Sequence, residues 1–169
     1  MAFVIGEGGP KDRNAIQLAT RAGTWIKNER RLERAPEALA AAIAMCAPFG
    51  GTLRSITGTY NCVGMVFASR RTWVQPDELA PIFGDDGYRE IADSEAMEGD
   101  IVLYRDGSGD PCHVGVVFQR TTDVSSATTE LIVLSKWGAN GEYLHGRNQL
   151  PVLLLGKSSV VMSESRRRF

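Results

Sequence analysis

The sequence predicts an α+β fold in which helices come first along the chain and antiparallel strands follow. Two observations carry this prediction. Before Gly99 apolar residues recur at helical spacing, whereas after it short β-rich runs alternate with turns of Gly, Asp, Ser and Thr. Helices followed by a run of strands, without regular alternation of the two, are typical of the α+β class.

Helices are expected at four places. Residues 11–27 have only fair helical spacing. The run that starts at Pro36 is a stronger candidate, because proline suits the first helical position and alanine and leucine fill the turns after it. A third helix is expected to begin at Asn61 or Cys62, and a short fourth one covers 76–83.

Strands are expected where apolar runs are bounded by turn-forming residues. The first three of these runs are close together in the sequence, so they are expected to pair as antiparallel hairpins. The expected strands are 101–105, 113–119 and 130–137, followed by two more apolar runs at 152–155 and 159–162.

A single domain is expected over 1–169. The chain has 169 residues, 43% of them hydrophobic, which is enough to bury a core. The sequence contains no internal repeat and no low-complexity linker. Within the domain, we expect a helical N-terminal extension at 1–50 and a core at 51–169, with the N-terminal helices packed on a small antiparallel sheet.

Charge and composition exclude several classes of function. A formal net charge of −1 without a basic stripe argues against a dedicated nucleic-acid binder. No apolar run approaches the roughly 20 residues that a membrane span needs, and residues 1–10 lack the pattern of a secretory signal. Three cysteines without paired spacing do not indicate a disulfide framework. The expected location is the cytoplasm, or the outside of the cell after export without a cleaved signal peptide.

Cys62 lies at a predicted helix start after a polar loop, a position that favours thiol chemistry. The free N–H groups and the positive end of the helix dipole stabilise a thiolate there. The same N–H groups can stabilise the oxyanion of a tetrahedral intermediate. The competing interpretation is a small buried hydrophobic residue, since free cysteine is among the most buried residue types.

His113 is the second candidate. It opens a predicted strand after a loop, so its side chain can point into a cleft while Val114, Val116 and Phe118 fill the core. The chain holds only two histidines. Together with Cys62, His113 indicates nucleophilic catalysis by a Cys–His pair.

These segments resemble the NlpC-type cell-wall cysteine peptidases and, more distantly, the CHAP amidases of the papain-like group. The family pattern has a cysteine at a helix start in a context such as D-C-S-G, then P-G-D before a strand, then H-V-G. In this sequence the three parts read N-C-V-G-M-V at 61–66, E-G-D-I-V at 98–102 and H-V-G-V-V at 113–117. Their order fits the family, and the resemblance covers about residues 55–140.

The resemblance implies a papain-like (NlpC-type) α+β fold and a cysteine hydrolase that cleaves an amide or isopeptide bond, with Cys62 as nucleophile and His113 as general base. It implies no cofactor and no metal. The expected partners are a peptide or amide substrate, with peptidoglycan stem peptides as the family's usual target, and an immunity or inhibitor protein. Asn61 and Val63 depart from the usual Asp and Ser, which puts that specificity in doubt. Tyr60, Asn61 and Trp137 are the expected substrate-binding residues.

A third catalytic group that orients His113 is implied on the strand that follows it. If this strand pairs with 113–119 as a hairpin, its end lies opposite His113, which points to Ser135, Lys136 or Trp137. Ser135 is chosen because only its hydroxyl can accept a hydrogen bond from the imidazole. Three later residues could take the same role or line the cleft: Asn140, Glu142 and His145.

Two rival functions stay open. One is a catalytically inactive papain-like domain that acts as a binding module. The other is a zinc site formed by Cys62, Cys112, His113 and His145. Zinc is the weaker of the two, because structural sites use closely spaced pairs, whereas neighbours on a strand such as Cys112 and His113 point to opposite faces.

Overall fold

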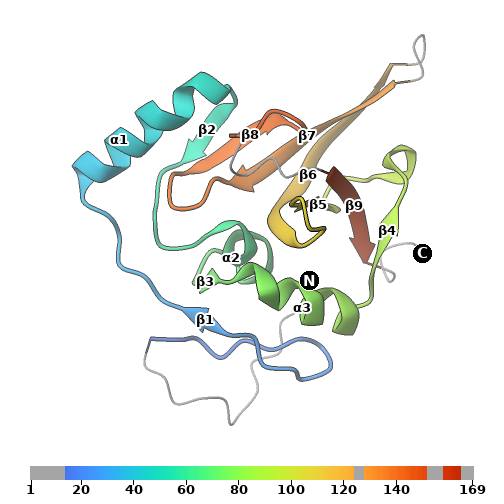
Figure 1. Cartoon of the computed structure of the whole chain (residues 1–169), viewed down its shortest axis with the longest axis horizontal. Coiled ribbons are helices and arrows are strands. Elements are labelled where there is room, and N and C mark those ends of the chain that lie inside the picture. Colours follow the sequence, from blue (N-terminus) through green and yellow to red (C-terminus); the bar gives the residue numbers. More distant parts are fainter. Residues whose placement is uncertain (1–13, 124–127, 152–157, 165–169) are drawn as a thin grey trace.

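The computed structural model describes residues 14–123, 128–151 and 158–164, and the structural statements below refer to these residues. They form a seven-stranded antiparallel sheet with the strand order β2-β8-β7-β6-β5-β9-β4, and a separate two-stranded pair of β1 and β3 (Figure 1). The elements in chain order are β1 (Asn28–Glu29), α1 (Pro36–Cys46), the 3₁₀ turn η1 (Ala47–Phe49), β2 (Thr52–Ser55), α2 (Cys62–Phe67), β3 (Trp73–Val74), η2 (Pro76–Glu78), α3 (Leu79–Asp85), β4 (Tyr88–Ile91), η3 (Asp93–Glu95), β5 (Ile101–Arg105), β6 (Pro111–Asp123), β7 (Thr128–Lys136), β8 (Glu142–Gly146) and β9 (Ser158–Glu164).

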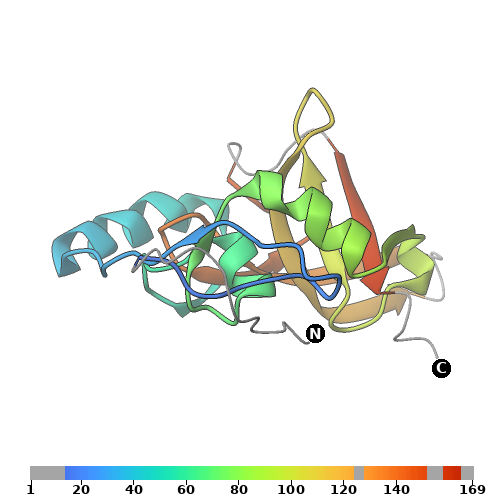
Figure 2. The ribbon, with the colours of Figure 1, turned by 90° about the horizontal axis from the view of Figure 1, so that it is seen from below.

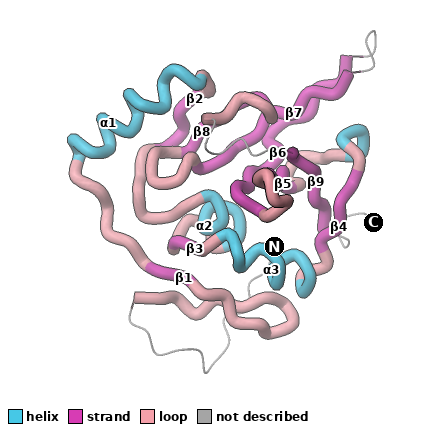
Figure 3. Tube along the Cα trace, viewed as in Figure 1, coloured by secondary structure: helices cyan, strands magenta, loops and turns pink. Residues whose placement is uncertain are grey.

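The predicted α+β class is confirmed, with fewer helical residues than strand residues in the described chain (Figure 3). The helices expected from Pro36, from Cys62 and within 76–83 are present as α1, α2 and the unit of η2 and α3. The three strands expected after Gly99 are present as β5, β6 and β7, and β6 pairs with β7 as the expected hairpin. The expected strand at 152–155 lies outside the described residues.

The prediction of a helix at 11–27 is wrong for the described part of that range, 14–27, which forms turns and an isolated bridge. The Asn28 side chain accounts for this conformation. It accepts a hydrogen bond from the Ile16 N–H and donates to the carbonyls of Ile16 and Ile26, so it holds the segment as a loop. Leu18 and Ile26 still reach the core, but as two separate anchors and not as one helix face.

The sheet separates two apolar clusters. One cluster joins α2 and α3 to alternate residues of the central strands, among them Leu103 and Val114. The other cluster uses the intervening residues, such as Val102 and Tyr104, on the opposite face. In Figure 1, α2 and α3 lie beside the central strands, whereas α1 extends from one end of the molecule, as Figure 2 also shows.

The start of α2 is fixed by Asn61. Its side-chain oxygen accepts hydrogen bonds from the N–H groups of Gly64, at 3.0 Å, and Val74, at 3.2 Å, while its amide donates to the Val74 carbonyl. A buried side chain with these three bonds both caps the helix and ties it to β3. The close approach requires a glycine, because a Cβ on Gly64 would lie 1.9 Å from the backbone oxygen of Thr72.

This contact predicts that Gly64→Ala lowers the free energy of unfolding by at least about 2 kcal/mol, since backbone must move to admit the methyl group. Gly84→Ala is the matched control. A Cβ on Gly84, in α3, would meet no atom within 4 Å. That substitution should be neutral or stabilise by up to about 1 kcal/mol through helix propensity. Urea denaturation of both variants measures the difference, and equal stabilities would contradict the close contact.

Candidate functional site

Cys62 is the first residue of α2 and is 6% exposed. Burial raises the pKa of its thiol, and the backbone N–H groups of Val114, Val63 and Cys62 itself act in the opposite direction. Cys62 therefore has the N–H environment expected of a helix-start cysteine, but it is also a member of the apolar cluster around α2 and α3. The surroundings of Cys62 thus agree in part with a reactive helix-start thiol and in part with a small buried hydrophobic residue.

His113 does not meet Cys62. In the register of β5 with β6, His113 pairs with Tyr104 and Val114 pairs with Leu103. Paired residues project on the same face of a sheet and adjacent residues on opposite faces. Cys62 packs in the cluster that contains Val114, so the His113 side chain lies on the other face, with its ring 5.4 Å from that of Tyr104.

The imidazole of His113 is fully buried, and neither of its nitrogens has a hydrogen-bond partner among the described residues. Burial, assisted by His145, lowers its pKa to about 3. The ring is therefore neutral at physiological pH. In this geometry His113 neither bonds to the Cys62 thiol nor carries the charge that a thiolate–imidazolium pair needs.

Ser135 does not orient His113 either. The register of β6 with β7 places Ser135 opposite Gly115, two positions from His113. Its Oγ lies 2.7 Å from His145 Nε2 and accepts a hydrogen bond from the Trp137 indole N–H at 3.1 Å. His145 Nδ1 lies 2.8 Å from the Gly146 carbonyl, which can only accept. Nδ1 therefore carries the proton, and the Ser135 hydroxyl donates to Nε2.

The expected substrate-binding residues are largely enclosed. Trp137 is buried and its ring stacks on Tyr143 with centroids 4.0 Å apart. Asn61 is used as the cap of α2. Tyr60 is 5% exposed, and its hydroxyl donates to Glu142 Oε1 at 2.6 Å. Among the loop alternatives, Asn140 accepts a hydrogen bond from Arg34.

A cluster of polar side chains does lie on the face of Cys62, and we call it the Lys136 cluster: Tyr60, Arg70, Lys136 and Glu142. Lys136 pairs with Glu142 across β7 and β8, and both are buried. Arg70 donates through Nε and Nη2 to the two oxygens of Glu142, at 2.6 and 3.2 Å. The Lys136 ammonium donates to the Gly138 carbonyl at 2.7 Å and lies 5.4 Å from the centre of the Tyr60 ring.

Sequence reasoning considered Lys136 only as a partner of His113 and set it aside, because an ammonium cannot accept a hydrogen bond from the imidazole. Arg70 was not among the candidate site residues. The strand register, which the sequence does not specify, is what identifies Lys136. Since Gly115 pairs with Ser135, the next residue of β7 lies across from Val114, whose N–H interacts with the Cys62 thiol. Arg70 also has a left-handed backbone, with φ of 63°, as does Ser69 with φ of 50°. Such strained non-glycine residues concentrate at functional sites.

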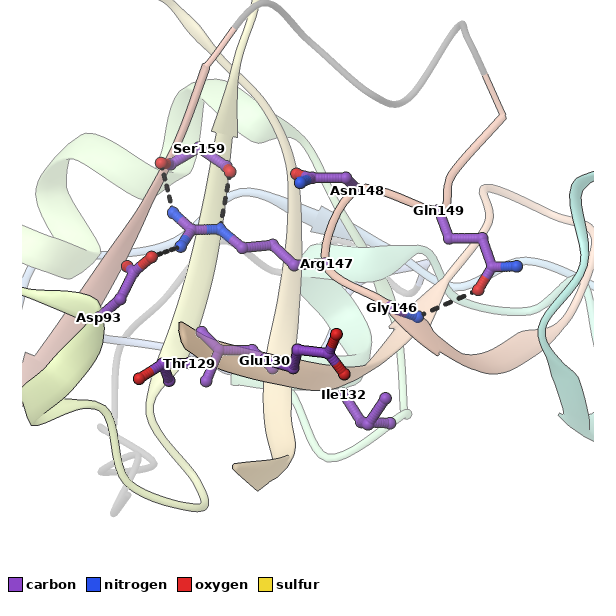
Figure 4. A pocket seen from close by; sticks show the side chains of 10 residues that line it. Asp93, Thr129, Glu130, Ile132, Gly146, Arg147, Asn148, Gln149 and Ser159 are labelled. Atoms are coloured by element: carbon purple, nitrogen blue, oxygen red, sulfur yellow. Dashed lines mark hydrogen bonds and ion pairs between the residues drawn. The ribbon is translucent and has the colours of Figure 1, made fainter. Parts of the chain in front are cut away.

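A cavity of about 680 Å³ lies elsewhere, at the ends of β7 and β8 (Figure 4). Arg147 crosses it and is held by the protein at all three guanidinium nitrogens: it forms an ion pair with Asp93 and donates to the hydroxyl and the carbonyl of Ser159. Arg147 thus joins β8 to β9. Cys62 is not among the lining residues.

No group of three or more His, Cys, Asp or Glu residues that could hold a metal ion occurs in the described part of the chain. Cys112 is half-buried and donates to the Tyr104 carbonyl, 3.4 Å away. None of the described helices is both long and apolar enough to cross a membrane.

The buried His113 predicts a loss of stability in acid. Its pKa is about 3 in the folded protein and about 6.5 in the unfolded chain. A depressed pKa means that the unfolded state takes up the proton first, so stability is full above pH 6.5 and falls as pH decreases towards 3. The loss from this residue alone is about 2 kcal/mol at pH 5.

His113→Leu, which fills the site with an apolar side chain, should remove that part of the pH dependence. Urea denaturation at pH 8 and pH 5 measures the change in unfolding free energy for both proteins, and contributions from carboxylates cancel in the comparison. His145, whose pKa burial also lowers, retains its own contribution. Parallel pH dependences in the parent and His113→Leu would contradict the burial of a neutral His113.

Comparison with known proteins assigns the chain to a family. A family model described as "Domain of unknown function (DUF7689)" matches residues 52–163. No curated protein and no solved structure matches the chain. The matched region begins with β2 and contains α2, the Lys136 cluster and both histidines. Because it spans more than half of the chain, the protein belongs to the DUF7689 family, whose function is unknown.

Proposed function

We propose that the protein is a papain-like cysteine hydrolase that cleaves an amide or isopeptide bond, with Cys62 as the nucleophile. One observation supports this proposal above the others. Cys62 begins α2, and the backbone N–H groups of Val114, Val63 and Cys62 act on its sulfur. These groups are suited to stabilise first a thiolate and then an oxyanion. The order of a helix-start cysteine followed by antiparallel strands supports the papain-like assignment.

The chemistry would proceed through a thioester. The Cys62 thiolate attacks the substrate carbonyl carbon, and the oxyanion is held by backbone N–H groups at the start of α2. The C–N bond then breaks, and the amine leaves with a proton taken from water, which balances the proton that the Cys62 thiol gave to water on ionising. Water attacks the thioester, the acid is released and the thiol is restored. His113 is given no part in these steps, because it faces the opposite side of β6.

The substrate class follows from the resemblance to cell-wall peptidases. Peptidoglycan stem peptides are the first candidates, and other peptides or isopeptides are the second. The enclosed positions of Tyr60 and Trp137 mean that neither side chain offers an open binding surface in this conformation. An immunity or inhibitor protein remains a proposed partner for an enzyme of this kind.

A second candidate function, a catalytically inactive papain-like binding domain, is favoured by a different observation. Cys62 packs within an apolar cluster, burial raises the pKa of its thiol, and the nitrogens of His113 have no hydrogen-bond partner within 14–123, 128–151 and 158–164. In that case the cysteine serves packing, as free cysteine commonly does in protein cores.

The substitution Cys62→Ala distinguishes the two functions. If Cys62 is the nucleophile, it should abolish release of products from purified peptidoglycan or muropeptides, followed by mass spectrometry, because no other group forms the thioester. Cys112→Ser is the matched control and should keep turnover, since Cys112 contacts the Tyr104 carbonyl away from α2. Circular dichroism checks that both variants are folded.

Turnover that survives in folded Cys62→Ala would exclude Cys62 as nucleophile. Absence of any product from the parent, together with a Cys62 thiol that iodoacetamide modifies no faster than buried Cys46, would favour the binding domain.

A further inference from the structure

We propose that Lys136, and not His113, is the charge partner of Cys62: its buried ammonium stabilises the thiolate and sets the pH range in which the thiol reacts. This inference rests on the proposed function, because it concerns the same nucleophile. It differs from what the family resemblance implies, where an imidazole has that role.

The register of the sheet places Lys136 on the face of Cys62. Ser135 pairs with Gly115, and both lie on the face of Tyr104 and His113. The next residue along β7 projects to the other face. Lys136 therefore lies across from Val114, the residue of β6 whose N–H acts on the Cys62 sulfur.

The Lys136 side chain runs towards the start of α2. Its ammonium lies 5.4 Å from the ring centre of Tyr60, which precedes Cys62 by two residues, and donates to the Gly138 carbonyl at 2.7 Å. An ammonium has three donors. The cation interacts electrostatically with Cys62, and each group favours the charged form of the other.

The residue is fully buried, which is costly for an ammonium unless opposite charge lies nearby. Burial lowers the pKa of Lys136 to about 8, whereas Glu142, Cys62 and Glu33 raise it and Arg34 lowers it. The ammonium is therefore the main form at pH 7 and is lost as pH rises through about 8. Because burial raises the pKa of the Cys62 thiol, the cation acts on the minor thiolate population that exists near neutral pH.

The carboxylates around Lys136 already have partners other than the lysine. Glu142 accepts hydrogen bonds from Tyr60 and Arg70, and the Arg70 guanidinium compensates its charge without the lysine. Glu33 accepts from the N–H groups of Gly58 and Arg34. Glu142 therefore does not need Lys136 to balance its charge. Among the described residues that act most on the Cys62 pKa, Lys136 is the one cation.

The test is the rate of iodoacetamide modification of Cys62 between pH 6 and 10, followed by mass spectrometry of the peptide that contains it. Lys136→Gln removes the charge but keeps a donor for the Gly138 carbonyl, and Lys136→Arg keeps the charge. We expect Lys136→Gln to react at least about tenfold more slowly at pH 7.5, with its curve moved to higher pH by about one unit or more. At pH 7.5, Lys136→Arg should stay within about threefold of the parent, because the guanidinium is charged as the ammonium is.

His113→Leu should follow the parent curve. Superimposable curves for Lys136→Gln and the parent, or a shift produced by His113→Leu, would overturn the assignment of Lys136. Lys136→Met, in which an apolar chain of similar length replaces the buried cation, serves as the neutral variant if Lys136→Gln does not fold.

The outcome for the parent separates this inference from the proposed function. A parent Cys62 that reacts no faster than Cys46 at any pH overturns the nucleophile and with it the role of Lys136. A reactive Cys62 whose curve is insensitive to Lys136→Gln leaves the nucleophile in place and overturns the inference alone.

Discussion

The close approach of α2 to the segment that follows it is the constraint on which the candidate site depends. Gly64 leaves no room for a side chain against the Thr72 carbonyl, and Asn61 joins the helix start to Val74. The short helix is therefore held against the sheet by backbone contacts and not only by its apolar side chains. This position brings the Cys62 sulfur within reach of the Val114 N–H on the central strand β6. A helix displaced by the width of one methyl group would lose that contact.

Once α2 is fixed, the pleat of the sheet decides which polar groups can act on the thiol. Lys136 and Glu142 are buried on the side of Cys62, and Arg70 and Tyr60 complete the charge balance there. Buried ion pairs contribute little net stability, because the loss of hydration offsets most of the attraction. Burying a lysine and a glutamate beside a cysteine is therefore poorly explained by stability alone, and such groups concentrate at functional sites. The left-handed backbone of Arg70 also indicates a functional site, because strained non-glycine residues concentrate at such sites.

The sequence predicted much of the fold and less of the site, for a physical reason that one strand illustrates. Hydrophobic spacing and turn residues identified α1, α2 and the hairpin of β6 and β7, because these signals are local. The face on which His113 lies depends on register, and a shift of one residue exchanges the two faces. The H-V-G pattern is the same in either case, so it could not separate a histidine beside Cys62 from one beside Tyr104. Ser135 was expected opposite His113. It lies on the same face but two positions along β6, opposite Gly115, where it contacts His145.

The two faces of the sheet therefore hold two polar systems whose pKa values lie in different pH ranges. His113 cannot reach the α2 side by a slip of β6, because the slip would also move Val114 out of its apolar cluster. The neutral histidines, with Ser135 and Trp137, govern how the fold tolerates acid, since protonation of either ring is opposed by burial. The Lys136 cluster acts near neutral and alkaline pH, where its ammonium is lost. If Lys136 has the proposed role, a change in Cys62 reactivity between pH 7 and 9 originates on the α2 face, whereas the buried histidines on the other face lower the stability of the fold below pH 6.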